Sequence, residues 1–168
     1  MAPSWANAGS ATDGGGTPTT VAVALGSNLG DREAHLSFAV ERLARFLQDL
    51  RVSAFHHTAP EGVGEQPEFL NAAAVGETLL APRPLLEALQ SIERERGRER
   101  PHWGAARTLD LDLVLHGTAI VDEPDLQVPH PRFRTRRFVL MPLAEVARDL
   151  RDPVSGLSVG ELLRRLGA

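Results

Sequence analysis

Two acidic residues separated by a single leucine stand out in the stretch "RTLDLDLVLHG", residues 107–117. Aspartate is a poor strand former, because its short polar side chain competes with the backbone for hydrogen bonds. In an extended strand alternate residues share a face, so Asp110 and Asp112 would point to one side and the leucines to the other. Two parallel carboxylates repel each other unless a proton or a cation lies between them, and hard oxygen ligands suit Mg²⁺. The pattern therefore indicates a magnesium site, with two solvated aspartates on a half-exposed strand as the alternative.

The segment just before this pair, "ERERGRERPHWGAART", carries five arginines between positions 94 and 107, together with Trp103. A metal-bound polyphosphate and a cyclic substrate require arginines that bind the phosphate oxygens, carboxylates that bind the metal and an aromatic side chain that stacks on the ring. The alternative is a salt-bridged helix end, because glutamates interleave with the arginines.

The composition excludes several kinds of chemistry. The 168 residues, 42% of them hydrophobic, are enough for one domain with a real core. The absence of cysteine excludes disulfides, thiolate metal sites and a cysteine nucleophile. All 18 basic residues are arginine, which excludes a phosphate-loop lysine and a Schiff-base lysine. The net charge of −4 argues against nucleic acid as a partner. No apolar run approaches the ~20 residues of a membrane helix and no signal peptide is evident, so we expect no membrane partner and a cytoplasmic protein.

Hydrophobic periodicity and turn residues predict the order of the elements. Residues 1–19 are aperiodic and polar, which indicates a disordered tail ahead of one domain at 20–168. The expected elements are a strand at 20–25, a helix with leucines at helical spacing over 36–50, strands at 51–58 and 69–79, a helix at 84–97 and a strand at 108–115. This order is typical of an α+β fold, a ferredoxin-like antiparallel sheet with helices packed mainly on one face.

Beyond residue 118 the pattern is weaker. We expect a short strand near 119–122, a helix over 142–149 and a final helix over 158–166, capped by Ser158.

Several motifs occur in an order that resembles a known family. "ALGSNLGD", "HHTAPEGVGEQPEFLNAA", "QSIERERGR", "RTLDLDLVLHG" and "VPHPRFRTRRFVLMPL" have the spacing of the 6-hydroxymethyl-7,8-dihydropterin pyrophosphokinases, and the resemblance covers about residues 20–166. It implies transfer of diphosphate from ATP to the hydroxymethyl group of the pterin, with release of AMP, in folate biosynthesis. It also implies a monomer that uses two Mg²⁺ ions.

The resemblance implies a role for each matching residue. Asp110 and Asp112 resemble the ligands of both magnesium ions, and Arg98 and Arg107 resemble catalytic arginines of a mobile loop that grip the phosphates. The residues that resemble the ATP site are Gln90, Glu93, Arg98, Arg107, Leu111, His130 and Arg136. Those that resemble the pterin site are Thr58, Ala59, Phe69, Asn71, Trp103 and Phe138. A flat heteroaromatic ring needs such a combination of aromatic faces and an amide.

Two other functions remain open at this point. A ferredoxin-like module that binds a nucleotide or a metal without catalysis would share the acidic strand, but it would not need both Arg98 and Arg107. A different magnesium-dependent phosphotransferase or hydrolase is the second alternative. Formation of AMP only when the pterin alcohol is present would distinguish all three.

Overall fold

A five-stranded antiparallel sheet organises the chain, which a computed structural model describes over residues 16–59, 68–97 and 108–167. The main elements, in order, are β1 (Thr19–Ser27), α2 (Arg32–Leu43), β2 (Gln48–Val52), β3 (His56–Thr58), β4 (Phe69–Thr78), α3 (Pro82–Glu95), β5 (Asp110–His116), α4 (Arg137–Ala147) and α5 (Val159–Gly167). The strands lie in the order β2-β4-β1-β5, and β3 also pairs with β4. This order confirms the α+β, ferredoxin-like prediction.

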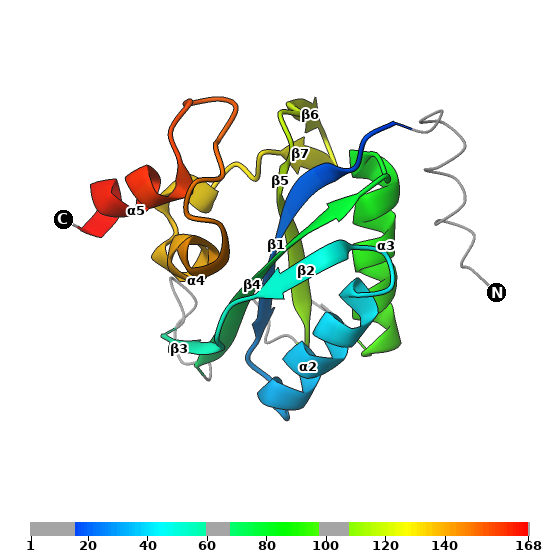
Figure 1. Ribbon diagram of the computed structural model, residues 1–168. Helices are drawn as coiled ribbons and strands as arrows, with labels where there is room; N and C mark the ends of the chain where they lie inside the picture. The colour runs from blue at the N-terminus through cyan, green and yellow to red at the C-terminus, as the bar shows by residue number, and fades with distance from the viewer. Residues whose placement is uncertain (1–15, 60–67, 98–107, 168) are drawn as a thin grey trace.

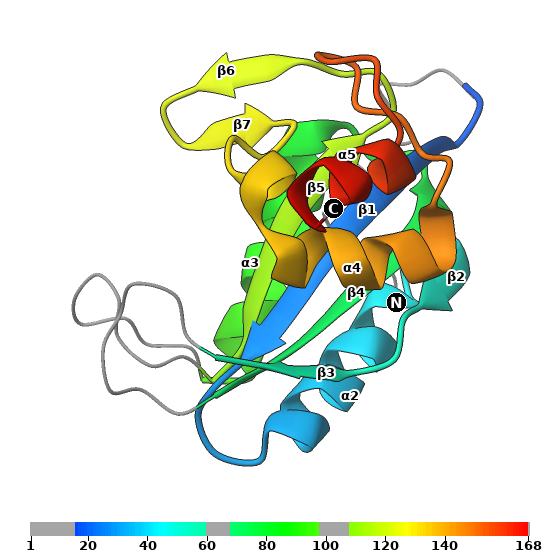
Figure 2. The ribbon, with the colours of Figure 1, turned by 90° about the vertical axis from the view of Figure 1, so that its left-hand side faces the viewer.

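Each face of the sheet buries its own hydrophobic cluster. Alternate residues such as Val21, Val23 and Leu25 in β1 pack against α2 and α3 on one face. Ala22, Ala73 and their neighbours pack against α4 and α5 on the other face. Figure 1 shows the sheet between these two helical layers. The pair α2 and α3 forms the layer that the ferredoxin-like pattern predicts, and α4 and α5 add a second layer. In Figure 2 the arrowhead end of β1 extends beyond α4.

The helix expected over 36–50 is shorter in the structure, because α2 ends at Leu43 and a new strand begins at Gln48. Leu47 is still buried, but as a connecting residue, and Leu50 lies in β2. The strand expected over 51–58 is divided into β2 and β3. Ser53 lies at the break, where its hydroxyl accepts a hydrogen bond from the Ala73 amide at 2.9 Å and replaces a backbone partner.

The later elements also refine the sequence prediction. The strand expected near 119–122 is β6 (Val121–Glu123), which pairs with β7 (Leu126–Val128) in a separate two-stranded sheet. A short 3₁₀ turn (Phe133–Thr135) follows. The helix expected from residue 142 begins at Arg137, with Pro142 inside it. Proline removes one helical hydrogen bond here, and the burial of neighbouring apolar side chains offsets that loss.

The final helix has the expected cap at Ser158. The Ser158 hydroxyl accepts from the Glu161 amide at 3.1 Å, and the Glu161 carboxylate accepts from the Ser158 amide at 3.2 Å. This reciprocal capping box satisfies two backbone donors at the start of α5.

At the other end of the chain, β1 begins at Thr19. Residues 1–15 lie outside the described residues, so the disordered tail stays a prediction. Among the helices that the structure describes, none combines the length and the apolar character needed to cross a membrane.

Candidate active site

One row of residues crosses three neighbouring strands of the sheet. Gly26 in β1 lies opposite Asn71 in β4 on one side and opposite Asp110 in β5 on the other. Adjacent strands are about 4.8 Å apart, so roughly 10 Å separates the backbones of Asn71 and Asp110. The row therefore brings together a candidate pterin residue and a candidate metal ligand from positions far apart in the sequence.

The two aspartates share one face of β5, as the alternation predicts. Asp110 and Asp112 are partly exposed, whereas Leu111 and Leu113 are buried in the core on the opposite face. Asp112 lies opposite Ala24, and Asp110 lies opposite Gly26. The small residues in β1 leave space beside both carboxylates.

The donor set around the aspartates fits Mg²⁺. Among the described residues, no group of three or more histidine, cysteine, aspartate or glutamate side chains is placed to hold a metal ion. A cation held by Asp110 and Asp112 would therefore complete its coordination with water and substrate oxygens. Magnesium is commonly bound in this way, through one or two carboxylates together with phosphates.

Glu93 supports the acidic strand from the core side of the sheet. Its side chain is 4% exposed, and its Oε2 atom accepts a hydrogen bond from the Leu111 amide at 2.7 Å. Leu111 lies between the two aspartates on β5, an edge strand of the sheet. The Glu93 carboxylate therefore orients the backbone that carries the aspartates. Gln90, one turn earlier on α3, is exposed.

Three of the candidate pterin residues form a cluster at the other end of the row. Asn71 is buried, and its Nδ2 atom donates a short hydrogen bond to Oγ1 of Thr58. Thr58 lies opposite Phe69 in the pairing of β3 with β4. The Oδ1 atom of Asn71 lies over Gly26, because a Cβ added at Gly26 would be 3.0 Å from that atom. Ala59 follows β3 directly and is exposed.

His130 and Arg136 lie near the Asp110 end of the row, and only Arg136 carries a positive charge. Burial lowers the pKa of His130 to about 4; the Arg136 charge acts in the same direction, whereas Asp110 opposes the shift. His130 is therefore neutral near neutral pH. Its Nδ1 atom accepts from the Arg132 amide at 3.1 Å, so the proton is on Nε2, which is a hydrogen-bond donor.

Phe138 lies in the first turn of α4 and packs against the hydrophobic cluster on the same face of the sheet as the aspartates. The Arg136 guanidinium carbon is 5.5 Å from the centre of its ring, within the range of a cation–π contact. The start of α4 thus supplies an aromatic face and a cation together.

Arg98, Trp103 and Arg107, which the resemblance assigns to the substrate-binding loop, lie outside the described residues. Their roles stay predictions.

The sequence interpretation missed Gly26 and a pair formed by His56 and Glu145. Glycine inside a strand is typical of a close approach to another group, so the "GSNLGD" motif held a signal for Gly26. His56 lies opposite Asn71, and its ring pairs with the Glu145 carboxylate of α4. No sequence pattern links two residues that are 89 positions apart.

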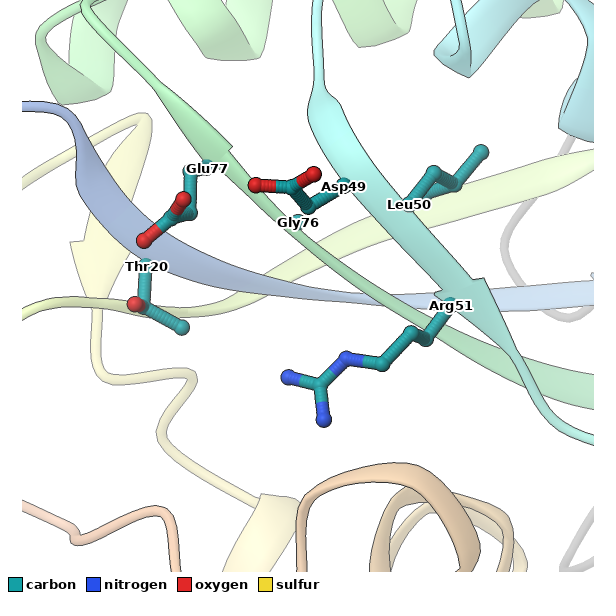
Figure 3. A pocket seen from close by; sticks show the side chains of 6 residues that line it. All are labelled: Thr20, Asp49, Leu50, Arg51, Gly76 and Glu77. Carbon is teal, nitrogen blue, oxygen red and sulfur yellow. The ribbon is translucent and has the colours of Figure 1, made fainter.

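A hollow of about 480 Å³ lies elsewhere, at the start of β1, and Figure 3 shows the side chains around it. It is lined by Thr20, Asp49, Leu50, Arg51, Gly76 and Glu77. Thr20 is six residues before Gly26 in the same strand, about 20 Å away at ~3.3 Å per residue. This hollow contains none of the candidate residues and is distinct from the candidate site.

Comparisons with known proteins agree on one family. The model described as 7,8-dihydro-6-hydroxymethylpterin-pyrophosphokinase matches residues 22–148. A 2-amino-4-hydroxy-6-hydroxymethyldihydropteridine pyrophosphokinase of Pseudomonas aeruginosa is 45% identical over 146 residues, which cover 85% of this chain and 89% of the relative. The Bacillus subtilis protein of the same name is 44% identical over 131 residues, covering 76% and 78%.

Solved structures support the same fold. Wild-type HPPK-DHPS of Plasmodium falciparum superposes with a TM-score of 0.69 at 12% identity, over 89% of this chain and 45% of that chain. This chain therefore spans less than half of that longer protein, and the likeness concerns the fold alone.

Proposed function

Because the chain belongs to the 7,8-dihydro-6-hydroxymethylpterin-pyrophosphokinase family, we propose that the row Asn71, Gly26 and Asp110 is the floor of its active site. The enzyme transfers diphosphate from ATP to the hydroxymethyl group of 6-hydroxymethyl-7,8-dihydropterin in folate biosynthesis. The pterin hydroxyl releases its proton to water, its oxygen forms a bond to the β-phosphorus, the bond from that phosphorus to the α-phosphate oxygen breaks, and AMP leaves with that oxygen. The site must therefore hold a flat ring at one end and a triphosphate at the other.

The Asn71 end of the row has the chemistry of the pterin site. A buried amide offers both a donor and an acceptor to the edge of a heterocycle, and Phe69 and Phe138 offer aromatic surface to its faces. Thr58 fixes the orientation of the Asn71 amide through their hydrogen bond. We therefore assign Thr58, Phe69, Asn71 and Phe138 to pterin binding, together with Ala59 at the end of β3. The roughly 10 Å between Asn71 and Asp110 is comparable to the length of a bicyclic ring that carries one short substituent.

The Asp110 end has the chemistry of the phosphate site. As an ATP-using kinase of this family, the enzyme typically needs Mg²⁺, and we propose that Asp110 and Asp112 hold two such ions. When bound, the ions supply charge neutralisation on the phosphates and a lower pKa for the pterin hydroxyl. With that chemistry available, no described side chain is needed as a general base.

The remaining residues would bind and orient ATP. His130 is neutral and carries its proton on Nε2, so it donates a hydrogen bond to a phosphate oxygen without adding charge. Arg136, close to His130 and Phe138, adds a positive charge to this end of the site. Glu93 holds the backbone at Leu111, and Gln90 is exposed on the same helix. The predicted loop residues Arg98, Arg107 and Trp103 would close over the substrates and exclude water.

We further propose that the enzyme is a monomer, because the row is complete within one chain. We expect it to act in the cytoplasm, where ATP is available and a chain without cysteine needs no oxidising compartment.

The observation that carries this assignment is the single row that joins Asn71 to Asp110 through a residue without a side chain. The test is chromatographic separation of AMP, ADP and phosphate after incubation with Mg²⁺ and ATP, with and without the pterin alcohol. We expect AMP only when the pterin is present, in equal amount to the pterin diphosphate. Formation of ADP, or of phosphate without pterin, would contradict the proposal.

A further inference from the structure

One side-chain pair joins the edge of the sheet to helix α4 close to the candidate pterin site. The His56 Nε2 atom forms a short hydrogen bond with Oε2 of Glu145. The other carboxylate oxygen of Glu145, Oε1, accepts a hydrogen bond from the Ala54 amide at 3.1 Å. The side chains of His56 and Glu145 are only 25% and 37% exposed. Both oxygens of Glu145 are therefore bound by the segment that leads into β3.

The position of His56 in β3 relates this pair to the substrate. His56 lies opposite Asn71, and Thr58, two residues later, lies opposite Phe69. Residues i and i+2 of a strand share a face, so His56, Thr58, Asn71 and Phe69 all lie on the face that carries the candidate site. His56 thus extends the row of Gly26 and Asn71 by one more strand.

The position of Glu145 in α4 completes the relation. Phe138 and Glu145 are seven residues apart in one helix, close to two turns, and therefore lie on the same side of α4. That side borders the buried face of α4, which Val139, Leu140 and Leu143 form, and at Glu145 it reaches His56 of β3. The pair therefore connects the strand that carries Thr58 with the helix that carries Phe138.

We propose that His56 and Glu145 are positioning residues for the pterin, which set the separation between the Asn71 amide and the Phe138 ring. A flat ring that binds between an amide and an aromatic side chain requires a slot of defined width. The pair fixes this width by holding α4 to β3, and it touches neither the phosphate residues nor the substrate. This inference rests on the proposed pterin roles of Asn71 and Phe138.

The alternative is that His56 and Glu145 only stabilise the fold. A second contact between the sheet and α4, made by Arg51, provides a matched control for a loss of stability alone. Nη1 of Arg51 donates to the Val146 carbonyl at 2.8 Å, so Arg51 also joins the sheet to α4 one residue beyond Glu145. Arg51 lies in β2, opposite Val75, away from the Asn71 row. Figure 3 shows the Arg51 side chain at the separate hollow, which Thr20 and Glu77 also line. Loss of either contact should reduce stability, but only loss of Glu145 should change pterin binding.

The experiment compares Glu145→Ala, Glu145→Gln and Arg51→Met with the full-length wild type. It measures the Kd for 6-hydroxymethyl-7,8-dihydropterin, the Kd for a non-hydrolysable ATP analogue with Mg²⁺, and the melting temperature. We expect Glu145→Ala to raise the pterin Kd about tenfold, which is the effect expected from the loss of one hydrogen bond that restrains the site. The Kd for the ATP analogue should stay within about twofold of the wild-type value. Glu145→Gln should recover part of the affinity, since its single amide oxygen can replace one of the two carboxylate acceptors. Arg51→Met should lower only the melting temperature.

Equal effects of Glu145→Ala and Arg51→Met on pterin affinity would overturn the inference, as would a parallel loss of affinity for the ATP analogue. If Glu145→Ala does not fold, His56→Phe provides the same test, because it keeps the bond between Ala54 and Glu145. Asn71→Ala separates this inference from the assignment of the site. If Asn71→Ala abolishes pterin binding and the Glu145 variants do not weaken it, the positioning role is wrong but the site is right. If Asn71→Ala has no effect, the assignment of the site itself fails.

Discussion

Asn71 and Asp110 lie in the same row of the sheet, and Gly26 is the only residue between them. The amide oxygen of Asn71 occupies the space over Gly26, at 3.0 Å from the position where a Cβ would lie. A side chain at Gly26 would therefore meet the Asn71 amide at the centre of the proposed site. This relation leads directly to the first prediction.

Gly26→Ala should weaken pterin binding, because the added methyl group would displace the Asn71 amide from its position. We expect the Kd for the pterin to rise about tenfold, or ~1.4 kcal/mol, with little change in the Kd for ATP. Gly76→Ala is the matched control, since a Cβ there would be 3.0 Å from the Gln48 carbonyl oxygen, at the other end of the sheet. The control should lower stability without changing pterin affinity. Equal effects of both variants on pterin affinity would count against the role of Gly26.

Asp110→Ala and Asp112→Ala should each reduce turnover by about 10³-fold or more, because the proposed magnesium ions would lose a carboxylate ligand. The fold should remain intact or become slightly more stable, since removal of one of two like charges relieves repulsion. Steady-state kinetics and thermal melts measure both effects. Asp122→Ala, a change at an exposed acidic residue of β6, should leave turnover unchanged. Near wild-type turnover in either site variant would remove that residue from the site.

Glu93→Ala should reduce both stability and turnover, because it leaves the Leu111 amide without the carboxylate that accepts from it. A buried unpaired amide costs about 1–3 kcal/mol. Glu93→Gln keeps an acceptor oxygen and should retain more stability and more activity than Glu93→Ala. Denaturant unfolding and kcat measurements test this order. If the two variants were equally impaired, the hydrogen bond to Leu111 would not be the important contact.

Asp152 should make the free energy of unfolding depend on pH in the acid range. Its side chain is fully buried and accepts hydrogen bonds from Arg134 at 2.5 and 3.0 Å. Burial alone would raise its pKa, but the bonds from Arg134 and Ser155 outweigh that effect and lower the pKa to about 2. The pKa in the unfolded chain is about 3.9. Because the folded value is lower, the carboxylate stabilises the fold above pH ~4, and this contribution is lost as the pH falls towards 2.

Asp152→Asn should therefore lower the free energy of unfolding by about 2 kcal/mol near pH 7 and by much less near pH 2. Urea unfolding of wild type and variant across this range measures the difference. A difference that stays constant with pH would show that the charge of Asp152 is not responsible.

The acidic strand shows how much of the site a sequence can predict. The alternation of leucine and aspartate over 109–113 predicted both the strand and the face of each side chain, because the period of two in a strand is local. The ferredoxin-like order of elements followed from the same kind of local pattern. Ser158 likewise predicted the start of α5, because an N-cap acts on backbone groups within the next three residues.

Features that depend on tertiary contacts were not predictable in this way. The expected strand is interrupted at Ser53, whose hydroxyl accepts from the Ala73 amide, twenty residues away. The helix that begins at Arg137 includes Pro142, and its buried side chains compensate for a residue that usually ends a helix. The contacts of Glu93 with Leu111 and of His56 with Glu145 join separate elements, and no spacing rule relates such residues.

We propose that Mg²⁺, ATP and pterin meet over the row of Asn71, Gly26 and Asp110. The most direct test of this proposal is an NMR measurement of backbone amide signals with Mn²⁺ in place of Mg²⁺ and a non-hydrolysable ATP analogue. The paramagnetic ion broadens the signals of nearby amides. We expect the strongest broadening at residues 110–112 and at Gly26, weaker broadening at Asn71, and none at Thr20 or Arg51 beside the separate hollow. Broadening centred on that hollow, or absent from residues 110–112, would contradict the proposal.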